Sequence, residues 1–230
     1  EEARPALRQA APKRSTRTCR VCGQRLPVKT SPPADQHDDQ LESWLLPKYK
    51  ATFWQLLILG QLGANVSSPA IYKACLRAFR FQDPKGNFTH YEGDTASAGL
   101  GGTITGLIVA ALLRMGWDYD ANLRKAILTL EQSATRVGGW FFDVKPLAAE
   151  SSAIHYKQIE RLIYPLEAFA EIPADQWTAS LRSLVDRVVQ FLLEQLPQLY
   201  QIEKYHYLSF PYLLNHDLLR LLLVLTKLGY

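Results

Sequence analysis

The sequence has no long apolar run, little net charge and few cysteines. Its most apolar stretch, residues 218–228, is interrupted by Arg220 and Lys227, whereas a membrane-spanning helix needs about 20 consecutive apolar residues. We therefore expect no membrane span in this sequence. The net charge is only +4, and the basic excess lies in the first 30 residues. Nucleic-acid binding by the rest of the chain is not expected.

Cysteine is scarce, but two of the three cysteines are close together. Cys19 and Cys22 form a Cys-x-x-Cys-Gly pattern, which is typical of a zinc knuckle, although a structural zinc needs four ligands. One interpretation is zinc held by Cys19, Cys22, His37 and a fourth ligand, or shared between two chains. A reducible dithiol and half of a zinc ribbon completed outside this chain are the alternatives. Cys75 is expected to be a buried apolar residue.

Residues 1–43 are predicted to form a mostly irregular, basic tail. They contain five prolines and many charges without apolar periodicity, which argues against a packed core. The chain begins with Glu1, and its only methionine is Met115. We therefore expect a processed product or a piece of a longer chain. We also expect a cytoplasmic location.

Residues 44–230 carry a repeated helical pattern. Apolar helices are closed at Gly63, Gly116 and Gly229, and Ile172 occupies the equivalent point of another copy, so the intervals are 53, 56 and 57 residues. Glycine is the usual residue where a helix ends in the left-handed conformation. An all-helical period slightly above 50 residues indicates an array of helical hairpins. Pro165 is expected to kink or split the third of the long apolar helices.

A second marker follows the first two outer helices. It is a Gln-x-x-x-Gly-x-aromatic pattern, present with two extra residues in the second copy and lost near residues 195–200; its members are Gln82, Gly86, Phe88, Gln132, Gly138 and Trp140. The pattern resembles the QW motif of the terpene cyclase and protein prenyltransferase superfamily, and the resemblance covers about residues 44–230. Phe88 and Trp140 are expected to be largely buried.

The resemblance implies an all-α fold, an α/α toroid built as a partial ring of about seven helices. Inner helices would surround a cavity, and outer helices would surround the inner ones. The inner helices are expected near residues 44–63, 99–116, 153–171 and 212–228, and the outer helices near residues 68–81, 120–135 and 175–196.

We expect a ligand at the mouth formed by the starts of the inner helices, where free N–H groups and helix dipoles converge. The loops at 90–102, 143–153 and 201–211 lead into that mouth. Its polar residues are His90, Glu92, Asp94, Glu150, His155, Tyr156, Tyr205, His206, Tyr207, His216 and Asp217. The ligand-binding candidates are Trp54, Asp94, Tyr156, Tyr207 and Phe210, and the catalytic candidates are His155, His206, His216 and Asp217. Each of these could instead cap a helix or pack in the core.

Two functions remain open from the sequence. The resemblance implies isoprenoid chemistry, but the D-x-D-D acid motif of such cyclases is missing, because Asp118 and Asp120 are followed by Ala121 and are predicted to be helix caps. A histidine metal site at the mouth would be the remaining catalytic arrangement. We favour a non-catalytic binding or scaffolding module for an apolar small molecule, a peptide or a protein partner.

The last inner helix lacks an outer partner in this sequence. Residues 211–230 are leucine-rich on more than one face, and soluble monomers rarely expose such a surface. We therefore expect an oligomer, a larger complex or a further segment to cover it. The alternative is that residues 39–49 or the tail fold back over it.

Overall fold

The computed structural model describes residues 16–18, 25–27, 43–94, 101–136, 139–141, 144–147, 153–207 and 217–230. The chain divides into two units, residues 1–40 and residues 41–230. In the described part of the second unit, the regular structure is helical, which confirms the all-α prediction. The helices are α1 (Thr52–Gln61), α2 (Pro69–Ala78), α3 (Gly101–Arg114), α4 (Ala121–Ser133), α5 (Ala153–Ala170), α6 (Ala179–Tyr200) and α7 (Leu218–Lys227), with short 3₁₀ turns η1 (Phe79–Phe81), η3 (Ala174–Gln176) and η4 (Glu203–His206).

The first unit contains a two-stranded ribbon that the sequence analysis did not predict. Strands β1 (Thr16–Thr18) and β2 (Arg25–Pro27) pair antiparallel, with Thr18 opposite Arg25. The proposed zinc ligands Cys19, Cys22 and His37 lie outside the described residues, so the zinc hypothesis stays a prediction.

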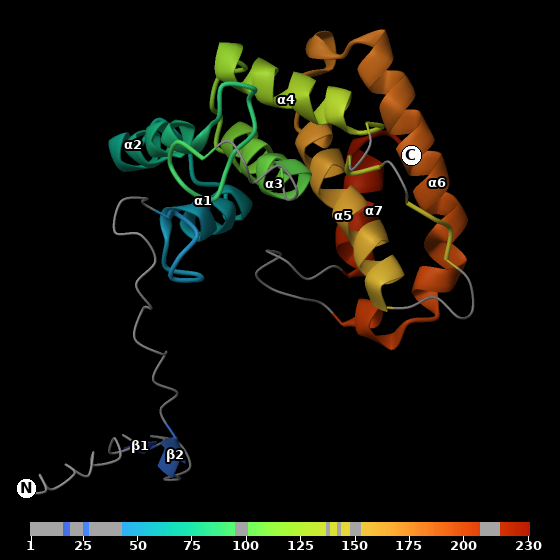
Figure 1. Ribbon diagram of the computed structural model, residues 1–230, viewed down its shortest axis with the longest axis horizontal. Helices are drawn as coiled ribbons and strands as arrows, with labels where there is room; N and C mark the ends of the chain where they lie inside the picture. The colour runs from blue at the N-terminus through green and yellow to red at the C-terminus, as the bar shows by residue number, and fades with distance from the viewer. Residues whose placement is uncertain are drawn as a thin grey trace, which may run out of the picture. The chain divides into compact units, whose positions relative to one another are not determined.

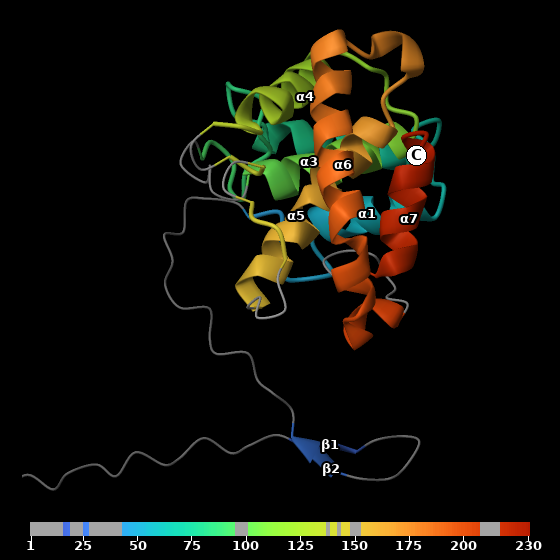
Figure 2. The same ribbon diagram turned by 90° about the vertical axis from the view of Figure 1, so that its right-hand side faces the viewer.

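Four of the helices, α1, α3, α5 and α7, pack against one another in chain order, α1 on α3, α3 on α5 and α5 on α7 (Figure 1). The backbone at Gly60 of α1 lies against Ala111 of α3, and Arg220 of α7 pairs with Glu167 of α5. The intervening helices α2, α4 and α6 return the chain, and α6 crosses in front of the others in Figure 2. We keep the name inner helices for α1, α3, α5 and α7, while their arrangement around a central cavity, with outer helices around them, stays a prediction.

The predicted glycine turns are confirmed at the ends of three inner helices. Gly63, Gly116 and Gly229 have φ angles of 76°, 79° and 90°, a conformation that costs a residue with a side chain about 1 kcal/mol or more. In addition, the N–H of Val66 donates to the carbonyl of Met115, which ties the end of α1 to the end of α3. The repeat phase read from the sequence therefore corresponds to equivalent structural positions.

Helices α3 and α5 make the closest crossing in the domain. A Cβ atom added at Gly106 would lie 2.6 Å from the backbone of Tyr164, so the crossing requires glycine there. Pro165 lies at this crossing, and α5 continues through it. Of the two expected effects of Pro165, a kink or a split, the split is therefore excluded, and the kink stays a prediction.

The first QW-like turn connects neighbouring outer helices. The side-chain amide of Gln82 donates to the carbonyls of Gly86, at 3.1 Å, and of Asn122 in α4, at 3.0 Å. Phe88 is fully buried, as predicted. Trp140 is only half-buried, and its indole N–H donates to the carbonyl of Leu130 at 2.8 Å. The prediction of a largely buried Trp140 is therefore met only in part.

The first inner helix begins later than predicted, at Thr52 instead of residue 44. The N–H groups of Lys50 and Ala51 both donate to the carbonyl of Pro47, which makes a turn in place of a helix. Trp44 anchors this segment, because it is buried, stacks on Phe81 with ring centres 4.6 Å apart, and donates its indole N–H to a backbone carbonyl. Tertiary packing here overrides the helical pattern of the sequence.

Candidate functional site

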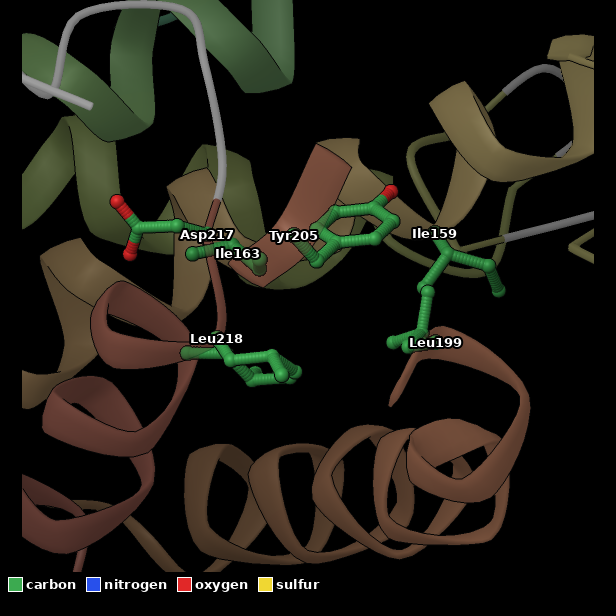
Figure 3. A pocket seen from close by; sticks show the side chains of 7 residues that line it. Ile159, Ile163, Leu199, Tyr205, Asp217 and Leu218 are labelled. Atoms are coloured by element: carbon green, nitrogen blue, oxygen red, sulfur yellow. The ribbon is translucent and has the colours of Figure 1, made fainter. Parts of the chain in front are cut away.

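The described residues at the mouth predicted to bind ligand line a very small cavity. The cavity has a volume of about 10 Å³ and lies among α5, α6, η4 and α7 (Figure 3). Its lining is almost entirely apolar and consists of Ile159, Ile163, Leu199, Tyr205, Asp217, Leu218 and Leu221. A volume of this size accommodates about one water molecule. The described side chains of α5, α6, η4 and α7 therefore pack closely around this cavity.

Asp217, a catalytic candidate, has a structural role in this cavity wall. Its side chain is buried and caps α7, accepting the N–H of Arg220 at 2.8 Å. A carboxylate in this position satisfies an otherwise free N–H and is stabilised by the helix dipole. The structure therefore explains Asp217 without catalysis.

The other described candidates from η4 and α1 are also bound to nearby backbone or surface groups. Trp54 is a core residue that donates its indole N–H to the carbonyl of Leu45 at 2.7 Å. Tyr207 is exposed and donates its hydroxyl to Glu203 at 2.7 Å. The exposed ring of His206 lies 2.6 Å from the carbonyl oxygen of Tyr200. The structure does not bring these side chains together.

The loop at residues 90–94 contributes a surface cluster. Glu92 makes an exposed ion pair with Arg80 at 2.7 Å. The ring of His90 stacks on Tyr91, and partial burial lowers its pKa, while the charge of Asp94 opposes that shift. A lowered pKa leaves His90 neutral near pH 7. This histidine packs beside the loop and is not the protonated acid that a cyclase would need.

The remaining candidates fall outside the described residues. These are Glu150, Phe210 and His216, together with the side chains of His155 and Tyr156 in the first turn of α5. Among the side chains that the structure does describe, no group of three His, Cys, Asp or Glu residues could hold a metal ion. As predicted, Asp120 is the cap of α4, accepting two backbone N–H groups at 2.9 Å.

A larger pocket lies at the opposite ends of the same inner helices. Its volume is about 460 Å³, and it is formed where α1, α3, α5 and α7 approach their C-terminal ends. It is lined by Gly60, Gln61, Gly63, Arg114, Glu167, Glu171, Arg220, Leu223, Val224 and Lys227. The size is within the range of sites that hold a small molecule or a side-chain cluster of a partner. We take this pocket as the candidate functional site.

A buried ion pair forms the floor of the pocket. Two nitrogens of the Arg220 guanidinium donate to the two carboxylate oxygens of Glu167, each at 2.7 Å. The side chains are only 3% and 5% exposed. Burial acts to lower the pKa of Arg220, but the Glu167 carboxylate outweighs it, so the pKa is raised and the guanidinium stays charged. Such a bidentate pair fixes both side chains in place.

A second, more exposed set of ion pairs forms the rim. One oxygen of Glu171 accepts from Arg114 at 2.7 Å and from Lys227 at 2.6 Å. Lys227 is half-exposed, whereas Arg114 and Glu171 are mostly covered. Arg114 and Lys227 stand in the last turns of their helices, where a cation is favoured by the negative end of the helix dipole.

The rim ion pairs join nearly equivalent positions of successive repeats, because Arg114, Glu171 and Lys227 each lie one or two residues before the end of their repeat, at residues 116, 172 and 229, whereas the buried Glu167–Arg220 pair joins positions that are not equivalent. Arg114 and Glu171 are 57 residues apart, Glu167 and Arg220 are 53 apart, and Glu171 and Lys227 are 56 apart. The two rim separations match the repeat period. The pattern at the helix starts did not predict this pocket. The sequence feature that could have predicted it is the recurrence of charged residues near the ends of otherwise apolar helices.

The pocket is equipped for binding. Its lining contains no serine, threonine, cysteine, histidine or tyrosine, which are the usual nucleophiles and proton-transfer groups besides carboxylates and lysine. Three cations face two carboxylates, so the lining carries one excess positive charge beside the apolar Leu223 and Val224. The arrangement suits an apolar group that carries a negative charge.

Comparisons with known proteins add no relative. No protein-family model matches the chain, and neither a curated protein nor a solved structure matches it. Within the described residues, the helices are all too short or too polar to cross a membrane. The superfamily resemblance therefore depends on the repeat phase and the QW-like turns.

Proposed function

We propose that this chain is a non-catalytic binding module with a prenyltransferase-like and squalene cyclase-like helical repeat. Its binding site is the pocket at the C-terminal ends of α1, α3, α5 and α7. The ligand is an apolar group with a nearby negative charge, presented by a small molecule, a peptide or a protein partner.

The observation that carries this proposal is the pairing of every charged side chain in the pocket lining. Glu167 and Glu171 each accept from cations at 2.6–2.7 Å. Each of these carboxylates is therefore already engaged in ion pairs within the pocket wall. The pairs hold the pocket open between four helices, and the half-exposed Lys227 brings the excess charge to the rim.

The competing function is an isoprenoid-processing enzyme with a metal or acid site at the other mouth. It would use His155, His206, His216 and Asp217 together. Of these, Asp217 caps α7 and His206 is exposed on η4. The cavity that the described residues of α5, α6, η4 and α7 line there has room for about one water molecule.

The direct test uses the fluorescent dye anilinonaphthalene sulfonate, an apolar anion, titrated into the full chain. Leu223→Trp is designed to fill the pocket, because Leu223 is half-exposed and lines it. Leu222→Trp is the matched control, since Leu222 is equally exposed but does not line the pocket. We expect Leu223→Trp to weaken dye binding about tenfold, which is about 1.4 kcal/mol, and Leu222→Trp to change it less than about twofold.

Two results would contradict the proposal. Equal loss of dye binding in both variants would show that the dye covers the helix surface instead of entering the pocket. Metal-dependent turnover of an isoprenoid diphosphate by the full chain, abolished by a chelator, would support the enzyme. Phenylnaphthylamine, which lacks the sulfonate, is expected to bind more weakly than the anionic dye, because it cannot use the excess positive charge.

A further inference from the structure

Helix α7 presents an exposed leucine face. Leu219, Leu222 and Leu223 are 39%, 51% and 50% exposed, and their i, i+3, i+4 spacing places them on one side of the helix. The opposite side, with Leu221, Val224 and Leu225, is buried. We call Leu219, Leu222 and Leu223 the α7 leucine face. Among the described residues nothing buries this face, which agrees with the expectation that the last inner helix lacks an outer partner.

The α7 leucine face is continuous with the pocket. Leu223 belongs to both. On the α1 side of the pocket, Leu62 stands between the lining residues Gln61 and Gly63 and is 66% exposed. An apolar group that lies on α7 can therefore reach the pocket through Leu223. Grooves of this kind receive amphipathic helices through apolar anchors spaced i, i+3, i+4.

The charges around the groove carry a positive excess. Neither α1 nor α7 contains an acidic residue, and the exposed charge that α7 contributes is Lys227, since Arg220 is buried in its pair with Glu167. The pocket lining has one positive charge in excess, and half-exposed Lys227 stands at its rim. Complementarity therefore calls for a negative charge on the bound surface.

We propose that the α7 leucine face and the adjoining pocket dock an amphipathic helix of a partner protein that carries an acidic residue beside its apolar side. The acidic residue lies near Lys227, and the apolar residues cover the leucines and enter the pocket. The inference rests on the proposed binding function and names the class of partner.

A second copy of this chain fits the same face less well. Two α7 helices packed on each other would bring Lys227 of each copy toward the other positive groove. Three half-exposed leucines also fall far short of the roughly 800 Å² per partner of a stable interface. A separate helix avoids the charge conflict and can also occupy the pocket, which a flat helix-to-helix contact leaves empty.

The experiment uses two labelled synthetic helices of about 18 residues, long enough to be helical in part. Both have leucines at i, i+3, i+4 and i+7, and the flanking positions are glutamate in one and lysine in the other. Fluorescence anisotropy with the full chain is expected to show binding of the glutamate peptide and at least about tenfold weaker binding of the lysine peptide. Lys227→Gln is expected to narrow that difference several-fold.

A matched pair of variants locates the site. Leu222→Ser is expected to weaken binding of the glutamate peptide about tenfold. Leu128→Ser is the control, because Leu128 on α4 is equally exposed, and it is expected to leave binding unchanged. Circular dichroism confirms that both variants keep their helices.

Three results would overturn the inference. The first is no binding of either peptide at millimolar concentration, and the second is equal binding of both peptides in all variants. The third is a concentration-dependent dimer in sedimentation that Leu222→Ser dissolves, which would identify a second copy as the occupant. If dye binding to the pocket persists while the peptides fail, the docking inference alone is wrong. If pocket-specific dye binding is also missing, the proposed function fails with it.

Discussion

Breaking the buried Arg220–Glu167 pair is expected to destabilise the helical unit strongly. Glu167→Gln keeps the shape of the side chain but removes its charge, which leaves a guanidinium that is only 3% exposed without its main counter-ion. Two charge-assisted hydrogen bonds of 2.7 Å are affected, and each is worth about 1.5–3 kcal/mol. The total agrees with the loss of stability of about 3–5 kcal/mol that follows when one partner of a buried ion pair is removed.

For Glu167→Gln we expect a loss of unfolding free energy near the lower end of this range, about 3 kcal/mol, because of the surroundings of Arg220. The ring of Tyr164 lies 5.5 Å from the guanidinium carbon, and the charge of Asp217 also acts on this arginine. Both partly compensate for the lost carboxylate. Replacing the two partners together, as Glu167→Leu with Arg220→Met, removes both charges at similar volume and is expected to cost less than about 1–2 kcal/mol.

The assay is equilibrium urea unfolding of the full chain, followed by circular dichroism at neutral pH. The single variants Glu167→Leu and Arg220→Met complete a double-mutant cycle with the double variant, and this cycle gives the coupling free energy between the two residues. Glu92→Gln is the matched control, because its pair with Arg80 is exposed and is worth at most about 1 kcal/mol. A loss below about 1 kcal/mol for Glu167→Gln, or a double variant as unstable as the sum of the single variants, would refute the reasoning.

Further predictions concern the turns, the buried thiol and the tail. Phe88→Ala is expected to cost about 3–5 kcal/mol in urea unfolding and Trp140→Ala less, since only Phe88 is fully buried; the reverse order would contradict the packing of the turns. Burial raises the pKa of Cys75 from its ordinary 9.0 to about 11, so thiol reagents are expected to react only on unfolding; fast labelling of the folded protein would exclude this. The same shift predicts a stability contribution that is complete below pH 9 and is lost as the pH rises toward about 11, which Cys75→Ala should remove from a pH series of unfolding midpoints. A chelator is expected to release about one zinc per Cys19/Cys22 site while circular dichroism of the helices stays unchanged; metal-free protein with both thiols freely alkylated would rule out the zinc.

The parts of the fold that were predictable from sequence are those determined by local chemistry. Glycine at Gly63, Gly116 and Gly229 is needed where the backbone turns left-handed, and the aspartate at Asp120 caps the helix that follows it. Such signals lie within a few residues of the structure that they determine. They predicted most limits of the helices that the structure describes in residues 44–230.

The site was not predictable in the same way, because it depends on residues that meet only in the folded chain. Asp217 and Trp54 resembled binding residues in the sequence, yet one caps a helix and the other packs in the core. Conversely, Arg114 and Glu171 looked like ordinary charges near helix ends. Arg114 and Glu171 are one repeat apart in the sequence, and they form an ion pair only because folding brings α3 and the end of α5 together.

The most direct test determines which end of the inner helices binds an apolar anion. Methyl NMR of the full chain, with labelled leucine, valine and isoleucine, would follow a titration with anilinonaphthalene sulfonate. The account predicts that the methyl signals of Leu223 and Val224, at the pocket, shift with the dye, while those of Ile159 and Ile163, at the opposite cavity, stay in place. Shifts confined to Ile159 and Ile163 would contradict this prediction and would indicate that the binding site is the mouth at the starts of the inner helices, as the sequence predicted.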